Sequence, residues 1–105
     1  MGCGSQPPRG VTRHAVQRLH EQYLKKYGAS RSDAQRIVRA LVQAYRKGAA
    51  NGMAVPVTAS TIRQTQAGRK IPEASLRKWG ITDNSGLIAL FSGGNILTIE
   101  HEMDS

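Results

Sequence analysis

Hydrophobic side chains recur every three or four residues through the first half of the chain, a spacing typical of amphipathic helices. The first such segment covers residues 13–27, and its apolar stripe consists of Val16, Leu19, Tyr23, Leu24 and Tyr27. Thr12 stands where an N-cap side chain can accept a hydrogen bond from the first turn, and Gly28 stands where a left-handed cap is suited. The pattern therefore predicts one helix over residues 13–27.

A second apolar stripe predicts a longer helix that ends before Gly48. Its members are Ala34, Ile37, Val38, Leu41, Val42 and Tyr45. Ser30 and Asp33 resemble a capping box at the start of this helix, with Asp in place of the usual Glu. Because only a short linker separates the two helices, we expect them to form an antiparallel hairpin.

The region that follows carries turn and strand signals. Asn51 and Gly52 indicate a turn. Pro56 has no N–H group to donate, so a strand over residues 53–57 is expected to be short or to lie at a sheet edge.

Helical signals return after this region, although the first part of it is ambiguous. Residues 60–67 fit either a short helix or a strand. Pro72 suits the first position of a short helix over residues 73–79, and Gly80 suits its end.

The last part of the chain predicts a β-hairpin. Two apolar segments, residues 87–91 and 96–101, flank the turn-forming residues 92–95. The first is apolar throughout, which predicts a central strand. Alternation in the second places Leu97, Ile99 and His101 on one face and Ile96, Thr98 and Glu100 on the other.

Taken together, these elements predict the α+β class, with two N-terminal helices packed on a small antiparallel β-sheet. Residues 1–10, rich in Gly, Pro, Ser and Gln, predict a disordered leader or linker. At 105 residues in total, the remainder, 11–105, is expected to form a single domain.

The net charge of the chain and its uneven distribution suggest that the protein binds nucleic acid. The chain has 15 Lys and Arg against 7 Asp and Glu, a net charge of +8. Residues 1–78 hold all 15 basic residues and only three acids, a net charge of +12, whereas residues 79–105 hold four acids and no Lys or Arg. A basic region of this size is the electrostatic footprint expected of a protein that binds phosphate backbones.

The sequence disfavours several other classes of protein, namely those that span a membrane, contain disulfides, bind metals or carry a phosphate-binding loop. No apolar run approaches the roughly 20 residues of a membrane span. The single cysteine, Cys3, allows no intrachain disulfide and fits a reducing, cytoplasmic compartment. The acids are scattered and the histidines lack ligand spacing, so we expect no metal site and no cofactor. Residues 92–95 fit a hairpin turn better than a phosphate-binding loop.

RNA cleavage without a metal is the chemistry that these residues permit. The 2′-OH of RNA can attack the neighbouring phosphate if one group accepts its proton and another neutralises the phosphorane. His14 and Arg18 lie four residues apart on one face of the first predicted helix, beside Arg13. Thr98 lies on the last predicted strand, and it joins them only if the helix packs against that strand.

Two further histidines have simpler interpretations. His20 lies at the edge of the apolar stripe and is interpreted as a packing residue. His101 lies among acids near the end of the chain and is interpreted as a frayed terminal residue.

The segment 12–18, the second amphipathic helix and the closing hairpin resemble small bacterial and phage ribonuclease toxins of the BrnT/RelE type, in the wider group that includes barnase, EndoU and the colicin tRNases. The resemblance covers about half of the chain. It implies N-terminal helices followed by a four-stranded antiparallel sheet, and it places active-site roles on His14, Arg18 and Thr98. It also implies an acidic antitoxin or immunity protein as partner. Gln22 departs from the pattern, because an Arg is expected after Glu21.

The leading hypothesis is therefore a metal-independent endoribonuclease of the toxin type that acts on RNA. His14 exchanges protons, Arg18 stabilises the phosphorane and Thr98 orients the phosphate. The residues expected to guide the RNA backbone are Arg13, Arg36 and Arg39.

A competing hypothesis is a non-catalytic DNA-binding regulator, since residues 59–72 resemble the recognition helix and exit turn of a Cro/repressor-type helix-turn-helix. Base contacts would come from Arg63, Gln64 and Gln66, and phosphate contacts from Arg69 and Lys70. Pro56 disfavours the first helix of such a motif. A third hypothesis is a phage-type inhibitor whose basic face binds an acidic protein.

Overall fold

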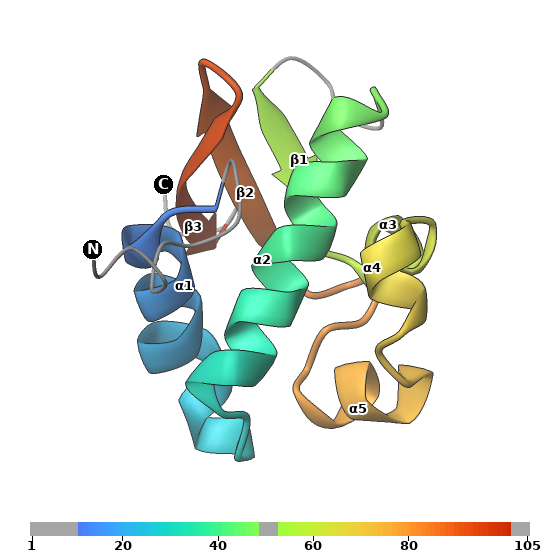
Figure 1. The fold of residues 1–105 in the computed structure, drawn as a ribbon. Helices are drawn as coiled ribbons and strands as arrows, with labels where there is room; N and C mark the ends of the chain where they lie inside the picture. The colour runs from blue at the N-terminus through green and yellow to red at the C-terminus, as the bar shows by residue number, and fades with distance from the viewer. Residues whose placement is uncertain (1–10, 49–52, 102–105) are drawn as a thin grey trace, which may run out of the picture.

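A helical N-terminal half and a three-stranded antiparallel sheet form the α+β fold of the computed structural model, which describes residues 11–48 and 53–101 (Figure 1). The elements in chain order are α1 (Arg13–Arg18), η2 (Leu19–Leu24), η3 (Lys25–Tyr27), α2 (Arg31–Arg46), β1 (Ala54–Pro56), α3 (Ala59–Arg63), α4 (Gln66–Arg69), α5 (Glu73–Lys78), β2 (Leu87–Ser92) and β3 (Asn95–His101). The predicted leader 1–10 and the predicted turn at 51–52 lie outside the described residues.

The first predicted helix forms over its whole expected length, but in three helical forms. An α-helical start passes into a π-helical segment, η2, and then into a 3₁₀ turn, η3. The predicted caps are both present: the Ala15 N–H donates to Thr12 Oγ1 at 3.2 Å, and Gly28 adopts a left-handed φ of 84°. The change of helical form has no counterpart in the sequence pattern, because the apolar stripe remains the same.

Helix α2 is the long central helix and runs in the opposite direction to α1 (Figure 1). Its predicted capping box is complete, since the Asp33 N–H donates to Ser30 Oγ at 3.0 Å and the Ser30 N–H donates to Asp33 Oδ2 at 2.9 Å. Its buried face contacts α1, η2, β1, α3 and α4. The predicted stripe therefore packs against nearly every layer of the fold.

The sheet has the order β1-β2-β3, so the apolar strand β2 is central, as predicted. Strand β1 is only three residues long and carries Pro56 at the sheet edge, which also agrees with the prediction. The four strands that the toxin resemblance implies are not formed by the described residues, which contain three. Residues 59–78 form helices α3, α4 and α5 instead.

A register shift in the hairpin makes the predicted alternation of β3 wrong at two positions. Leu90 pairs with Thr98 and Phe91 pairs with Ile96, so Leu97 is an extra residue without a partner in β2. Ile96 and Ile99 are both buried, whereas the side chain of Leu97 is 49% exposed. A β-bulge inserts one residue in this way and resets which face the following side chains occupy.

The ambiguous segment at 60–67 resolves as parts of two short helices, each capped by a threonine. Thr58 Oγ1 accepts from the Thr61 N–H, and Thr65 Oγ1 accepts from the Gly68 N–H. A Cβ added at Gly68 would lie 1.8 Å from the Ile62 carbonyl oxygen, so only glycine allows α4 to approach α3 this closely. The short helix α5 lies where it was expected, with Pro72 as its N-cap and Trp79 as its C-cap.

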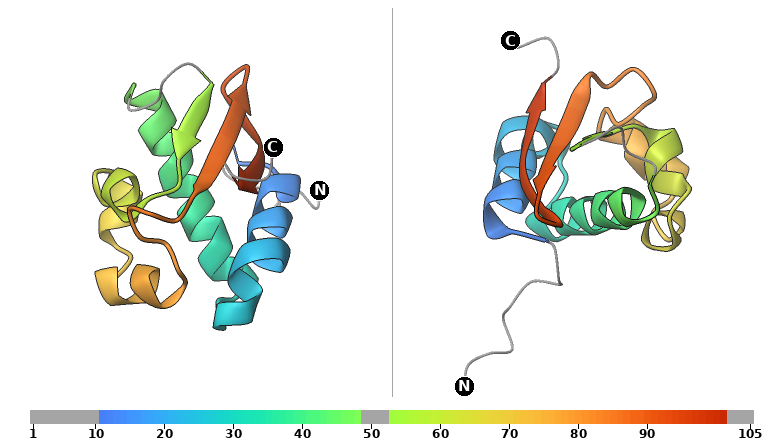
Figure 2. Two further views of the ribbon diagram at one scale, coloured as in Figure 1. Left: turned by 180° about the vertical axis from the view of Figure 1, so that it is seen from behind. Right: turned by 90° about the horizontal axis from the view of Figure 1, so that it is seen from above.

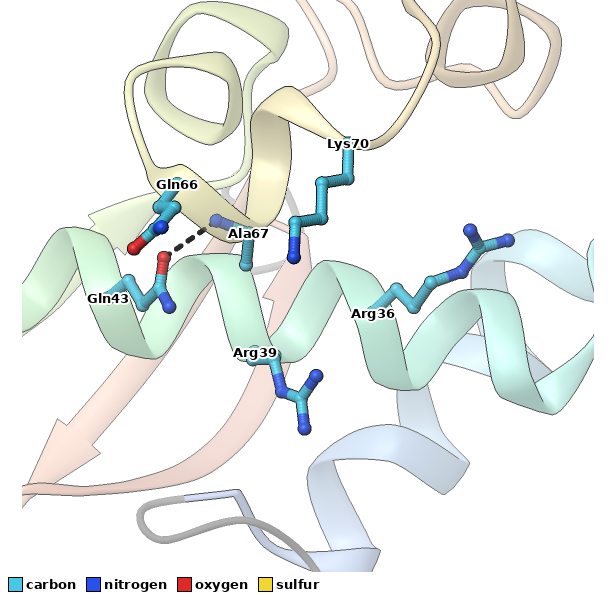
Figure 3. A pocket seen from close by; sticks show the side chains of 6 residues that line it. All are labelled: Arg36, Arg39, Gln43, Gln66, Ala67 and Lys70. Carbon is cyan, nitrogen blue, oxygen red and sulfur yellow. Dashed lines mark hydrogen bonds between the residues drawn. The ribbon is translucent and has the colours of Figure 1, made fainter.

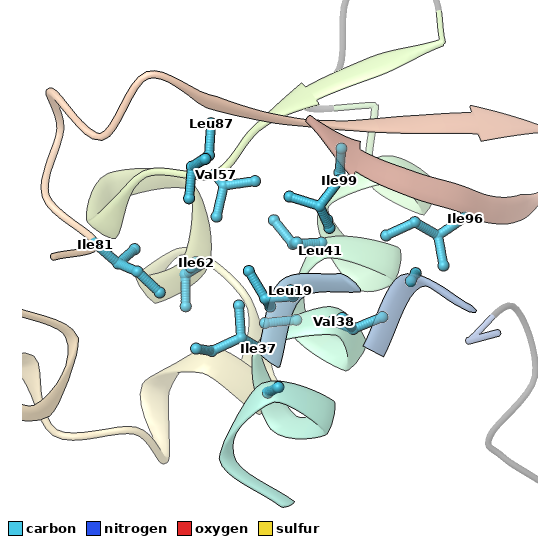
Figure 4. Packing of buried hydrophobic residues seen from close by; sticks show 14 of the residues in the cluster. Leu19, Ile37, Val38, Leu41, Val57, Ile62, Ile81, Leu87, Ile96 and Ile99 are labelled. Atoms are coloured by element: carbon cyan, nitrogen blue, oxygen red, sulfur yellow. The ribbon is translucent and has the colours of Figure 1, made fainter. Parts of the chain in front are cut away.

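One hydrophobic core joins the layers, with side chains from α2, the sheet and α3 converging on it (Figure 4). Its largest fully buried side chains are Phe91, Leu19, Leu24, Ile37, Leu41, Ile62, Ile71, Leu76, Ile81, Ile96 and Ile99. Among the described residues, no helix has the length and apolar character needed to cross a membrane.

Candidate nucleic-acid site

Helix α1 lies along the outer edge of strand β3, as the view from above shows (Figure 2). Thr12 Oγ1 donates to the Ile96 carbonyl at 3.0 Å, and Arg18 Nε donates to the Ile99 carbonyl at 2.7 Å. Six helical residues rise about 9 Å, and three strand residues span about 10 Å. The two contacts therefore align helix and strand side by side, and the packing that the candidate site required is present.

Arg18 and Thr98 converge on one carbonyl group. The Ile99 oxygen that accepts from Arg18 also lies 3.5 Å from Thr98 Oγ1. Guanidinium has five N–H donors, and this bond to the strand uses only the one on Nε. Strand β3 thereby holds the half-buried Arg18 in place, and its terminal nitrogens carry the donors that suit a phosphate.

His14 lies on the exposed side of α1, one turn before Arg18. It falls between the two contacts made by Thr12 and Arg18, so it is level with the middle of β3. Arg13 is its exposed neighbour. We call His14, Arg18 and Thr98 the helix–strand site.

The other two histidines lie elsewhere. The ring of His20 is partly buried, with Nε2 3.1 Å from the Ala29 carbonyl, which agrees with the packing interpretation. His101 is not a frayed terminal residue, because it pairs with Leu87 in the sheet and its ring lies close to Gly86. The interpretation failed because the acidic neighbours of His101 gave no indication that β3 extends this far.

A basic groove runs between α2 and α4, with a volume of about 280 Å³ (Figure 3). Its lining residues are Arg36, Arg39, Gln43, Gln66, Ala67 and Lys70. The Ala67 N–H donates to Gln43 Oε1 at 2.8 Å, which holds the two helices together at one end. The groove brings together three predicted phosphate-binding residues from segments about 30 positions apart.

The side chains of this α2/α4 groove differ in how they are held. Arg36 forms a 2.7 Å ion pair with Asp33, whose pKa is lowered chiefly by the hydrogen bond from the Ser30 N–H and also by Arg36. Arg39 points from α2 toward the side on which α1 lies (Figure 3). Gln43 was missed by the sequence reasoning, although its position four residues after Arg39 on the polar face could have indicated it.

The helix-turn-helix residues do not share one recognition helix. Arg63 is half-buried and donates to the Ile71 carbonyl at 2.7 Å, while Gln64 ends α3 as its C-cap. Gln66 begins α4 and lines the α2/α4 groove, and Arg69 is exposed at the end of α4. The expected continuous helix is broken because Thr65 caps a new helix one turn before Gly68.

Within residues 11–48 and 53–101, no three His, Cys, Asp or Glu side chains cluster closely enough to hold a metal ion. Cys3 lies outside the described residues. Comparison of the chain with protein-family models, with curated proteins and with solved structures found no significant match.

Proposed function

We propose that the protein is a metal-independent endoribonuclease of the toxin type. The observation that carries this proposal is the alignment of α1 with the edge of β3, which sets Arg18 and Thr98 around the Ile99 carbonyl and His14 one helical turn away. The net charge of +8 and the basic α2/α4 groove support RNA as the substrate.

The chemistry assigned to the helix–strand site is transesterification. The 2′ oxygen bonds to phosphorus while the bond from phosphorus to the 5′ oxygen breaks, giving a 2′,3′-cyclic phosphate and a 5′-hydroxyl. His14 accepts the 2′ proton, and the leaving 5′ oxygen takes a proton from water. His14 then returns its proton to the solvent, so no net proton is consumed. Arg18 stabilises the negative charge of the phosphorane, and the Thr98 hydroxyl orients a phosphate oxygen.

The basic residues on the same molecule supply the binding surface. Arg13 adjoins the helix–strand site, and Arg39 extends from α2 toward α1. Arg36 and Lys70 line the α2/α4 groove together with Arg39 and continue the positive surface there. The acidic antitoxin or immunity protein implied by the toxin resemblance would cover this surface, and that partner stays a prediction.

The test is incubation of the purified protein with total RNA in the presence of EDTA. We expect fragments that end in 2′,3′-cyclic phosphate, and a loss of cleavage of about 10²- to 10⁴-fold in His14→Ala, since this is the usual contribution of general acid–base catalysis. Gln17→Ala changes an exposed residue of the same helix and is the matched control.

The outcome also separates the competing classes. RNA that stays intact at high protein concentration would contradict the endoribonuclease proposal. If such RNA were nevertheless bound, the protein would be a non-catalytic nucleic-acid binder. Cleavage that is equal in His14→Ala and in the wild type would remove His14 from the mechanism.

A further inference from the structure

An aromatic pocket lies where η2 and η3 meet the end of α5 and the end of β3. Its volume is about 120 Å³, and four of its lining residues carry rings: Tyr23, Tyr27, Trp79 and His101. The remaining lining residues are Leu24, Lys26, Gly80, Ser85 and Leu87. A small cavity walled by several rings matches the shape and chemistry of a planar, unstacked base.

Two glycines allow these rings to lie close to the backbone. A Cβ added at Gly80 would lie 3.2 Å from the Tyr27 ring, and one added at Gly86 would lie 3.0 Å from Nε2 of His101. Both glycines also adopt positive φ angles, of 75° and 74°. The position of each ring therefore depends on the absence of a side chain opposite it.

The pocket combines a buried ring, an exposed ring and a cation. Trp79 is 8% exposed and belongs to the core, whereas Tyr27 is 42% exposed. Lys26 Nζ lies 5.2 Å from the centre of the Tyr27 ring. Tyr27 is thus accessible to solvent, and Lys26 places its positive charge over one face of the Tyr27 ring, which leaves the other face for a base and the ammonium for the attached phosphate.

The pocket also lies next to the helix–strand site along two elements. His101 follows Thr98 by three residues on β3, a span of about 10 Å. Tyr23 lies five residues after Arg18, in η2, which continues directly from α1. Because Thr98 and His101 lie on opposite faces of β3, an RNA strand whose phosphate lies at Arg18 would pass around the edge of β3 to bring a neighbouring nucleotide to the pocket.

We propose that the aromatic pocket is a base-binding subsite that stacks one unpaired RNA base against Tyr27, with Lys26 on the adjoining phosphate. This proposal rests on the proposed function for its choice of RNA, but the binding it describes does not require cleavage.

The single Trp of the chain, Trp79, lines the pocket and makes binding visible by fluorescence. The probe is a 2′-O-methyl oligoadenylate hexamer, which lacks the attacking hydroxyl and stays intact. We expect saturable quenching of Trp79. An abasic hexamer with the same phosphates should bind about tenfold more weakly and leave the Trp79 emission unchanged, because stacking of a base contributes about this much.

Substitutions on the pocket rim sharpen the test. Tyr27→Ala should weaken hexamer binding about tenfold, whereas Tyr27→Phe retains the ring and should bind like the wild type. Met53→Ala removes another exposed apolar side chain, away from the pocket, and should have no effect. Lys26→Ala should weaken binding more than Lys25→Ala, because Lys25 does not line the pocket.

The proposal is overturned if the abasic and base-bearing hexamers bind equally, or if Tyr27→Ala binds like the wild type. If only the endoribonuclease proposal is wrong, total RNA stays intact in the cleavage assay while the hexamer still quenches the Trp79 fluorescence. If only the base-binding subsite is wrong, the protein cleaves total RNA but the hexamer does not quench Trp79.

Discussion

At the scale of single residues, Thr12 and Arg18 each connect the start of the chain to its end. Thr12 accepts a hydrogen bond from the Ala15 N–H as an N-cap, and its hydroxyl also donates to the Ile96 carbonyl. Arg18 donates to Ile99 in the same strand. Since β3 is an edge strand, these side chains satisfy carbonyl groups that would otherwise be left exposed to another chain.

Thr12→Ala should lower the free energy of unfolding by about 2 kcal/mol, because it removes an N-cap worth about 1 kcal/mol and a hydrogen bond worth about the same. Thr12→Ser keeps both interactions and should stay within about 0.5 kcal/mol of the wild type. Urea unfolding measures the difference. Equal stability of the Ala and Ser variants would show that neither bond contributes.

At the scale of elements, α2 depends on an electrostatic arrangement at its start. The Ser30 N–H hydrogen bond lowers the pKa of Asp33 below the ordinary value of 3.8, and Arg36 lowers it further. A carboxylate in the first turn also interacts favourably with the helix dipole. The charge on Asp33 is therefore tied to the folded state of α2.

Asp33→Asn should cost about 1 kcal/mol at neutral pH, because it removes the charge at the cap. A carboxylate whose folded-state pKa is lowered stabilises the protein above its unfolded pKa and loses this effect as the pH falls through the folded pKa. The stability difference between the variant and the wild type should hence shrink below pH 4 or so. Thermal unfolding across pH 3–7 measures it, and a difference that is constant with pH would contradict this assignment.

At the scale of the whole molecule, positive charge is carried mainly by the helical part of the chain. Residues 13, 18, 36, 39 and 70 place cations on α1, α2 and the end of α4, around the helix–strand site and the α2/α4 groove. A polyanion bound by such a surface releases condensed counterions, so its affinity falls as salt rises. The proposed binding should follow this rule.

Arg39→Gln should reduce the slope of log affinity against log salt for a single-stranded RNA by about 0.7, the value for one lost phosphate contact. Arg77→Gln makes the same change in net charge on α5, where the arginine pairs with Glu73, and should leave the slope unchanged. Filter binding at several salt concentrations provides the measurement. Equal slopes for the two variants would indicate that only net charge matters.

Features with local causes can be predicted from the sequence alone. The caps at Thr12, Ser30 and Gly28, the stripe of α2 and the central place of β2 follow from neighbouring residues or from simple periodicity. The basic character of the first 78 residues is also a property of composition alone. These signals are sufficient to predict the α+β class, whereas the choice of His14, Arg18 and Thr98 as candidates also depends on the resemblance to ribonuclease toxins.

The way in which distant segments meet depends on the packing of the folded chain. The bulge at Leu97 arises from pairing between strands, which shifted Ile96 to the buried face. The bond from Thr12 to Ile96 joins residues 84 positions apart, and no local pattern encodes such a contact. The aromatic pocket likewise takes its rings from three separate segments. Periodicity predicts which face of a helix or strand is buried. It does not predict which other helix or strand covers that face, because the packing of the whole core sets this contact. A site formed between two elements therefore cannot be located from the periodicity of either one.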